Sequence, residues 1–256
     1  MAKPLILVTN DDGINAPGIR TLINVMKDVG DIIVVAPDSP QSGMGHAITI
    51  NSTLQCHKIK IDDGPQIEYS CSGTPADCVH IASRGIMKKI PDIVFSGVNI
   101  GSNMGDDVIY SGTVAGAIEG RFLGLPSIAM SLASWECNHF NTAGNIAKIL
   151  VNQIDKAPIS NNTIMNVNIP DIRINEILGI KSTRLGSRHK SAPSIQDSKD
   201  PTLYWIGENG KEADNDEGTD FHAISNNYVS VTPLQIDSTK YSEVLKLSNW
   251  LENINY

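Results

Sequence analysis

The sequence has no long apolar segment. Its longest apolar runs, such as Leu5–Val8 and Ile32–Ala36, are far shorter than the ~20 residues that a transmembrane helix needs. The first residues pass from one lysine into a short strand-like run and then into acidic residues, without the apolar stretch and cleavage site of a signal peptide. We therefore expect no membrane segment and a cytoplasmic protein.

Cysteine and positive charge are both scarce. The four cysteines form no C-x-x-C pair, so the sequence provides neither a zinc cluster nor a dithiol redox motif, and free thiols are expected: Cys56, Cys71, Cys78 and Cys137. The formal net charge is −8, which disfavours binding to the phosphate backbone of a nucleic-acid polymer. Any phosphate that the protein binds should be recognised locally.

Four common catalytic motifs are also absent. The glycines at 97, 101 and 105 do not form the G-x-G-x-x-G pattern of dinucleotide-binding proteins, and no G-x-x-x-x-G-K-[ST] phosphate loop occurs. Ser42 and Ser111 are not in a G-x-S-x-G motif, which disfavours a serine hydrolase. A haloacid dehalogenase requires D-x-D after the first strand, whereas this sequence has Asn10 and Asp12 at those positions.

Short β-branched runs alternate with segments of helical periodicity. Pro4–Val8, Pro17–Val29 and Asp31–Ala36 predict a βαβ unit. The same alternation continues, and it predicts strands at Ala47–Ile61, Ile67–Cys71, Asp92–Ser96, Ser127–Ser131, Ile164–Ile169, Thr202–Ile206 and Tyr228–Thr232, with helices at Pro75–Met87, Thr113–Leu123, Thr142–Ile154 and Tyr241–Leu251. The 256 residues, 41% of them apolar, thus predict a globular α/β protein with an open, mainly parallel sheet.

Three polar loops follow predicted strands and should converge at one edge of the sheet. They are Asn10–Gly13, Asp38–His46 and Gly97–Asn103. Together they contain carboxylate, hydroxyl and amide oxygens that suit a hard cation such as Mg²⁺ or Mn²⁺, from Asp11, Asp12, Ser42 and Asn99. The alternative is that Asn10–Gly13 is an Asx turn in which an aspartate caps the next helix.

The segment Tyr110–Ala117 predicts a helix start with small residues and hydroxyls. Its free N–H groups and the helix dipole could hold a phosphate at Ser111, Gly112 and Thr113. The alternative is an ordinary Ser or Thr cap, and capping also explains Thr74 without any chemistry. His46 is a candidate general acid, but a lone histidine more often has a structural role.

Several of these segments together resemble the SurE family, survival protein E. The resemblance is carried by VTNDDGINAPGI at 8–19, VVAPDSPQSGMGHAIT at 34–49, SGTPADCV at 72–79, PDIVFSGVNIGSNMGDDVIYSGTVAGAIEG at 91–120 and GLPSIAMS at 124–131. It is dense over residues 4–131, and later landmarks are NVNIP at 166–170, EGTDFHAI at 217–224 and YVSVTPL at 228–234.

The resemblance implies a metal-dependent nucleotidase that hydrolyses nucleoside 5′-monophosphates, often 3′-monophosphates and sometimes short polyphosphates, by attack of a metal-activated water. It implies one divalent cation per subunit, Mg or Mn, on Asp11, Asp12, Ser42 and Asn99. We expect Asp11 or Asp12 to be catalytic as well, as the acceptor of the water's proton, and the sequence does not choose between them. Its phosphate contacts fall on Asn103, Ser111, Gly112 and Thr113.

The resemblance further implies a Rossmann-like, three-layer α/β/α fold and a single domain over residues 1–256. An extended C-terminal arm at 184–227 would be exchanged between subunits of a homodimer or homotetramer. Two other functions stay open: a non-catalytic nucleotide sensor, and an exopolyphosphatase whose basic groove would use Arg184, Arg188, His189 and Lys190.

Overall fold

The computed structural model describes residues 3–156, 160 and 163–254. A nine-stranded sheet forms the centre, in the order β3-β4-β2-β1-β5-β6-β7-β13-β8. From β4 to β7 every neighbouring pair is parallel, whereas β3 and β13 run antiparallel to β4 and β7. The bounds are β1 Leu5–Thr9, β2 Asp31–Pro37, β3 Cys56–Ile59, β4 Ile67–Cys71, β5 Ile93–Ile100, β6 Ser127–Leu132, β7 Ile164–Ile169, β8 Gly179–Ser182 and β13 Tyr228–Leu234.

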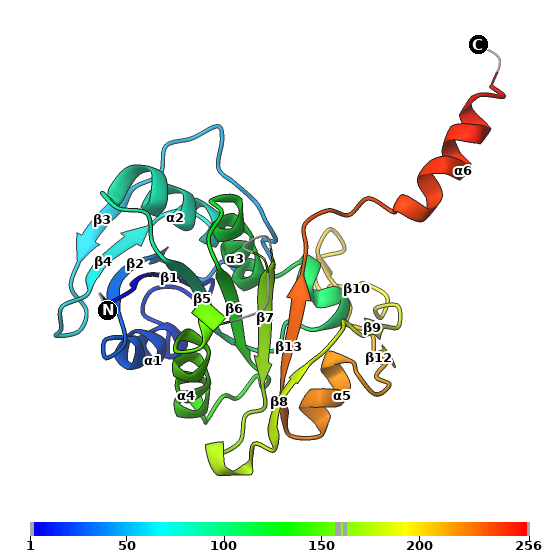
Figure 1. The fold of residues 1–256 in the computed structure, drawn as a ribbon. Coiled ribbons are helices and arrows are strands. Elements are labelled where there is room, and N and C mark those ends of the chain that lie inside the picture. The colour runs from blue at the N-terminus through cyan, green and yellow to red at the C-terminus, as the bar shows by residue number, and fades with distance from the viewer. Residues whose placement is uncertain (1–2, 157–159, 161–162, 255–256) are drawn as a thin grey trace.

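Helices cover both faces of this sheet, as Figure 1 shows. On one face α1 (Pro17–Met26) packs against α4 (Phe140–Val151), and on the other α2 (Pro75–Ile81) packs against α3 (Gly112–Phe122). Side chains of one strand alternate between the two layers, since Ile6 and Val8 join one apolar cluster and Leu7 joins the other. The expected α/β fold with a mainly parallel sheet is confirmed.

Some predicted boundaries are wrong. Residues 47–55 form no strand, and the hairpin strand begins at Cys56. The second predicted helix ends at Ile81 and continues as a π-helical turn, Ala82–Ile86. Strand β5 runs on to Ile100 instead of ending at Ser96. Its pairing register with β6 shifts between Ser96 and Asn99, and Gly97 and Asn99 lie at this irregularity.

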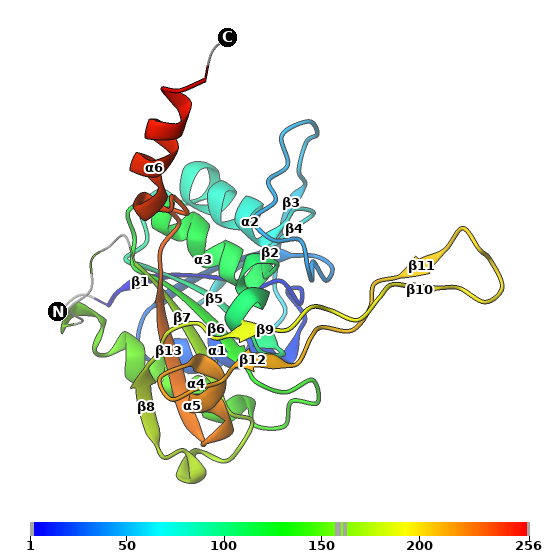
Figure 2. The same ribbon diagram turned by 90° about the vertical axis from the view of Figure 1, so that its right-hand side faces the viewer.

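The C-terminal part contains several elements that composition did not indicate, although β11 (Tyr204–Trp205) lies within the strand predicted at Thr202–Ile206. Helix α5 (Asp220–Ser225) packs on β13 and buries Phe221 and Ala223. Two short pairs, β9 (Ser187–Arg188) with β12 (Glu212–Asp214) and β10 (Ile195–Gln196) with β11 (Tyr204–Trp205), form a long hairpin that extends away from the sheet in Figure 2.

The last helix, α6 (Tyr241–Leu251), lies apart from the rest of the structure in both views and has no buried residue (Figures 1 and 2). Short 3₁₀ turns at Gly105–Ile109, Ile154–Lys156 and Ile174–Glu176 complete the described elements. Across the described ranges, no helix has the length and apolar character that a bilayer crossing requires.

Candidate active site

A cavity of about 490 Å³ opens beyond the carboxyl ends of β1 and β5. Its lining includes five residues that the sequence proposes for the site: Asp11, Ser42, Asn99, Asn103 and Ser111. Ligands of open parallel sheets bind at this edge. The fold therefore brings the three polar loops together, as expected from their positions after strands.

Asp11 is nearly buried, with 4% of its surface exposed. Thr113 Oγ1 donates a hydrogen bond to Asp11 Oδ1, and the backbone N–H of Gln41 donates to Asp11 O at 2.7 Å, which fixes the loop that carries Ser42. Burial raises the pKa of Asp11 to about 6, and the charge of Asp12 adds to this shift while Thr113 opposes it. An ionised Asp11 is costly here unless positive charge lies beside it.

Asp12 lies in a turn that leaves strand geometry. Strand β1 ends at Thr9, and Gly13 has a φ of +96°, which favours glycine. The N–H of Ile100 donates to Asp12 Oδ2 at 3.0 Å, so the turn is joined to the end of β5, and burial raises the pKa of Asp12. Helix α1 has Ala16 at its N-cap and no side-chain cap, so the alternative of an aspartate cap is wrong.

The irregularity in β5 sets the position of Asn99. The pairing register with β6 shifts between Ser96 and Asn99, and Asn99 lies opposite Ser131. A bulge of this kind changes the direction in which a side chain points. Asn99 Nδ2 donates to Gly101 O at 2.8 Å, which fixes the amide plane and leaves Oδ1 as the atom suited to a cation.

The donor chemistry of this set fits a hard divalent cation. Two carboxylates are combined with a hydroxyl and an amide oxygen, which are ligands that Mg²⁺ and Mn²⁺ accept and zinc sites rarely use. In the described part of the chain, no group of three or more His, Cys, Asp or Glu side chains is arranged to hold a metal. Any metal at this edge would therefore depend on Ser42 and Asn99 as well as on the aspartates.

At the start of α3 the structure agrees with both interpretations of the sequence: a side chain caps the helix, and the backbone is suited to an anion. Ser111 Oγ accepts from Val114 N at 3.1 Å, so its side chain is an ordinary helix cap. A Cβ added at Gly112 would lie 2.8 Å from Asp11 Cβ, so only glycine allows this approach. The first N–H groups of a helix have no acceptor within it. An anion would thus be bound by the backbone of Gly112 and Thr113, and in this structure the Thr113 N–H faces the Asp11 carboxylate.

Three glycines bring the whole of α3 close to the sheet. A Cβ at Gly116 would lie 2.7 Å from Ser96 Oγ, and one at Gly120 would lie 2.5 Å from Ser127 Oγ. With Gly112 these residues recur every four positions and form one face of the helix. This close packing holds the positive end of the helix dipole against Asp11.

Asn103 is held by polar side chains that the sequence analysis did not select. Its Nδ2 donates to Ser131 Oγ at 2.7 Å, and its N–H donates to Asn168 Oδ1 at 2.8 Å. Asn166 Nδ2 and Asn168 Nδ2 donate to Asn103 O at 2.8 and 3.0 Å. These partners are fully buried in β6 and β7. They could have been selected from the sequence because a polar residue inside an apolar strand needs a hydrogen-bond partner.

The outer wall of the cavity combines exposed aromatics with the C-terminal hairpin. Tyr110 and Trp135 line it, and Trp135 is 82% exposed. Ile206 and Asn209 reach it from the segment proposed as an arm. Such contacts between distant parts of the chain have no local sequence signal.

Asp220 fixes the base of that hairpin. Its Oδ2 accepts from Gly105 N and its Oδ1 accepts from Gly186 N, both at 2.8 Å. Gly105 precedes α3 by one short turn, so a single buried carboxylate joins the hairpin to the loop beside the cavity. Arg188 adds an ion pair with Asp107 at 2.7 Å.

His46 does not line the cavity, and it makes structural contacts. Its Nε2 lies 3.3 Å from Glu119 Oε2, and its ring stacks on Phe122. Thr74 is the N-cap of α2 in a full capping box with Asp77, as the sequence indicates. This pair also binds the loop of His46, since Thr74 Oγ1 donates to Ala47 O at 2.7 Å.

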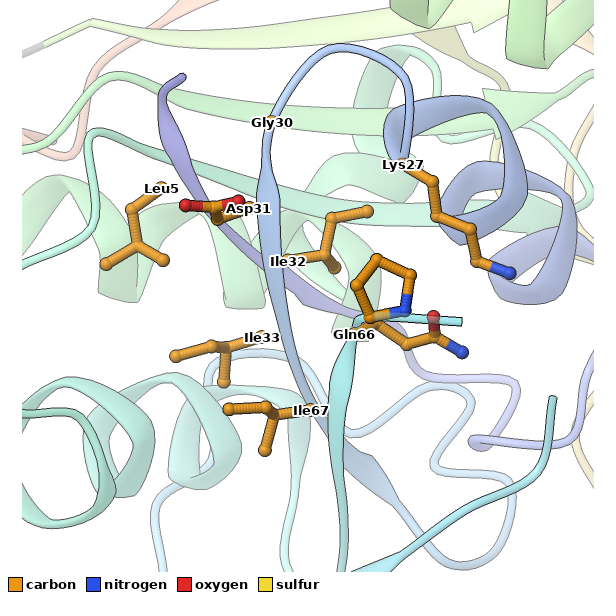
Figure 3. Close-up of a pocket in the computed structure, with 9 residues that line it drawn as sticks. Leu5, Lys27, Gly30, Asp31, Ile32, Ile33, Gln66 and Ile67 are labelled. Atoms are coloured by element: carbon orange, nitrogen blue, oxygen red, sulfur yellow. The ribbon is translucent and has the colours of Figure 1, made fainter. Parts of the chain in front are cut away.

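A second, smaller cavity of about 250 Å³ lies at the opposite edge of the sheet, where β1, β2 and β4 begin. Figure 3 shows Ile32, Ile33 and Ile67 along its lining, with Lys27 and Gln66 at one side. None of the predicted site residues lines it. The candidate active site is therefore the cavity at the carboxyl edge.

Comparisons with known proteins point to one family. The family described as Survival protein SurE matches residues 6–192. The protein named 5′-nucleotidase SurE from Ruthia magnifica subsp. Calyptogena magnifica is 56% identical over 249 residues, which cover 97% of this chain and 99% of the relative. A protein of the same name from Nitrosococcus oceani is 48% identical over 252 residues and covers 97% of this chain and 98% of its own.

A solved structure extends the similarity to three dimensions. The crystal structure of the SurE protein from Aquifex aeolicus superposes with a TM-score of 0.83 at 42% identity, and the match covers 98% of this chain and 100% of that one. Sequence and fold agree over nearly the whole length. The chain belongs to the SurE family.

Proposed function

We propose that this protein is a 5′-nucleotidase, a phosphoric monoester hydrolase that converts nucleoside 5′-monophosphates, and 3′-monophosphates as well, to nucleoside and phosphate. The observation that carries the proposal is the placement of buried Asp11 against the first turn of α3. In this arrangement a cation on Asp11 and an anion at the start of α3 would lie side by side. The names of the two relatives, 5′-nucleotidase SurE, support the same activity.

One divalent cation, Mg²⁺ or Mn²⁺, would be held by Asp11, Asp12, Ser42 and Asn99. When bound, it supplies positive charge to the phosphate oxygens and lowers the pKa of the attacking water. This charge would also offset the cost of ionising Asp11, whose pKa burial raises to about 6.

The chain's own groups then bind and orient the phosphate. The N–H groups of Gly112 and Thr113 donate to two of its oxygens and stabilise the charge that develops there. The Asn103 amide, fixed by Ser131, contacts a third oxygen. Asp11 or Asp12 accepts the proton of the water, and the Thr113 hydroxyl holds Asp11 in place for this step.

The wall of the cavity suits a nucleoside better than a longer polyphosphate. Trp135 and Tyr110 offer aromatic faces for a base. The two arginines of the proposed basic groove are already paired, Arg184 with Asp214 at 2.5 Å and Arg188 with Asp107 at 2.7 Å. We therefore expect hydrolysis of short polyphosphates to be a side activity.

A homodimer or homotetramer with exchanged arms belongs to the same proposal. Helix α6 exposes an apolar set with no partner in the described part of one chain: Tyr241, Val244, Leu245, Leu247, Trp250 and Leu251. The hairpin tip exposes another: Ile195, Leu203, Tyr204, Trp205 and Ile206. Exposed apolar patches of this size are typical of subunit contacts. Light scattering after gel filtration measures the state, and a monomer would contradict it.

The test of the activity is phosphate release from 5′- and 3′-nucleoside monophosphates and short polyphosphates, with chelator, Mg²⁺ or Mn²⁺. Wild type and Asp12→Asn are compared. Metal-dependent turnover that is lost in the variant supports the proposal. If the folded, metal-loaded wild type binds nucleotides tightly without turnover, the alternative of a nucleotide sensor is correct instead.

A further inference from the structure

Three of the four cysteines meet in the fold, although no C-x-x-C motif brings them together in sequence. Cys56 lies on β3, Cys71 on β4 and Cys78 on α2, and all three belong to one apolar cluster. The Sγ atoms of Cys56 and Cys71 are 2.8 Å apart. A disulfide bond measures about 2.04 Å, so these two atoms are already closer to a bond than to an ordinary contact.

The backbone around this pair suits a disulfide. Cys56 and Cys71 are directly opposite each other in the antiparallel β3–β4 ladder. Ser72 N donates to Gln55 O at 2.9 Å, so the adjacent pair is the hydrogen-bonded one and the cysteines form a non-hydrogen-bonded pair. The Cα atoms of such a pair are about 4.5 Å apart, within the range of about 4.4–6.8 Å that disulfides span.

The three thiols differ in proton affinity. Hydrogen bonds from Cys78 and then Cys56 lower the pKa of Cys71 to about 6. Burial raises the pKa of Cys78 well above its ordinary value and that of Cys56 to about 12. Cys71 is thus the thiol of the group that loses its proton most readily. Cys71 and Cys78 are buried, whereas Cys56 on the edge strand is only half-buried.

We propose that Cys56 and Cys71 form a redox-active dithiol, a modification site that a hydroperoxide oxidises to a reversible disulfide. Cys71 thiolate attacks the terminal peroxide oxygen, the O–O bond breaks, and hydroxide or alkoxide leaves and takes a proton from solvent, which gives a sulfenic acid and water or an alcohol. Cys56 sulfur then attacks Cys71 sulfur, the S–O bond breaks, and hydroxide leaves with the Cys56 proton as water. Two thiols lose two electrons, and the peroxide gains them.

The disulfide would clamp the segment that carries Ser42. This segment starts where Asp38 N donates to Cys71 O at 2.8 Å, and it ends where Gln55 pairs with Ser72. Oxidation therefore joins Cys56, next to one end of the segment, to Cys71, which contacts the other end through the Asp38 hydrogen bond. The covalent bond closes the β3–β4 hairpin loop, residues 57–70. A cross-link over a loop of this length stabilises the folded state, and we expect the melting temperature to rise by about 5–10 °C.

Trypsin separates the possible products. Its cleavage sites place Cys56 in peptide 28–58 and both Cys71 and Cys78 in peptide 61–84. The full-length protein is treated with hydrogen peroxide, its remaining thiols are alkylated, and the digest is analysed without reductant. We expect most chains to yield the two peptides joined, lighter by two hydrogen atoms, with fragmentation placing the link on Cys71. Dithiothreitol should reverse it.

Variants provide the controls. Cys56→Ser should lose the link and the rise in melting temperature, and Cys137→Ser, outside the cluster, should keep both. Cys78→Ala should still form the link but several-fold more slowly, because Cys71 loses a hydrogen-bond donor. The proposal is overturned if peroxide leaves the peptides unlinked in a folded wild type, or if the link joins Cys78 or Cys137. It does not depend on the nucleotidase activity.

Discussion

Replacing Asp11 with asparagine should affect folding and function in opposite directions. In the metal-free protein, burial raises the pKa of Asp11 from 3.8 to about 6. The protonated form is therefore favoured in the folded state. This contribution to stability is complete below pH 3.8 and is lost as the pH rises through about 6. At pH 7, ionising Asp11 costs about 3 kcal/mol of folding free energy.

Asparagine carries no charge and can still accept the hydrogen bond from Thr113. Its NH₂ group can meet the N–H of Thr113, which faces the Asp11 carboxylate, and this repulsion offsets part of the gain. We expect Asp11→Asn to raise the free energy of unfolding of the metal-free protein by about 1–3 kcal/mol near neutral pH and to have little effect at acid pH. Nucleotide hydrolysis should fall by on the order of 10²-fold or more, because both a cation ligand and an oriented proton acceptor are lost.

Urea unfolding in chelator at about pH 4.5 and about pH 7.5 measures the stability of both proteins. Titration with Mn²⁺ then shows whether the cation stabilises the wild type and fails to stabilise the variant. The reasoning is refuted if Asp11→Asn is less stable than the wild type near neutral pH by an amount that does not change with pH. Full activity with full metal affinity in the variant would instead refute the ligand assignment.

Three further predictions, each with its own substitutions, test the cavity and its support. Gly112→Ala and Gly116→Ala should each destabilise the protein by about 1–3 kcal/mol in urea, but only Gly112→Ala should also abolish most phosphate release, since its Cβ meets Asp11. Trp135→Ala should raise KM for nucleotides by roughly tenfold without changing hydrolysis of ribose 5-phosphate, while exposed Trp205→Ala, away from the cavity, should leave both unchanged. Phe221→Ala should cost about 3–5 kcal/mol, seen by calorimetry, and a loss under about 1 kcal/mol would contradict its burial.

The elements that sequence predicts best have strong periodicity and clear ends. The bounds of β7 and α6 match the expected ranges, and α1 starts at Pro17, where its missing N–H is tolerated. Helix α5 was missed because its core contact depends on Phe221 within a polar segment. Strand β8 is only four residues long, too short for a clear pattern.

In the candidate site, too, some residues can be found from the sequence and others cannot. Loops after strands are visible in a sequence, so the loops of Asp11, Ser42 and Asn99 were found from their composition and position. Asn168 was missed because it lies inside a strand and its role depends on a partner 65 residues away. Ile206 was missed because only the folded hairpin brings it to the cavity.

The hydrogen bonds that Asp220 accepts from Gly105 and Gly186 affect how this protein can evolve. They fix the base of the hairpin beside the cavity, while its tip extends into solvent (Figure 2). Insertions or substitutions at the tip can accumulate without disturbing the aspartates, because the base keeps its position. Natural selection can therefore change the partners of the hairpin, and the shape of the cavity's outer wall, independently of the catalytic chemistry.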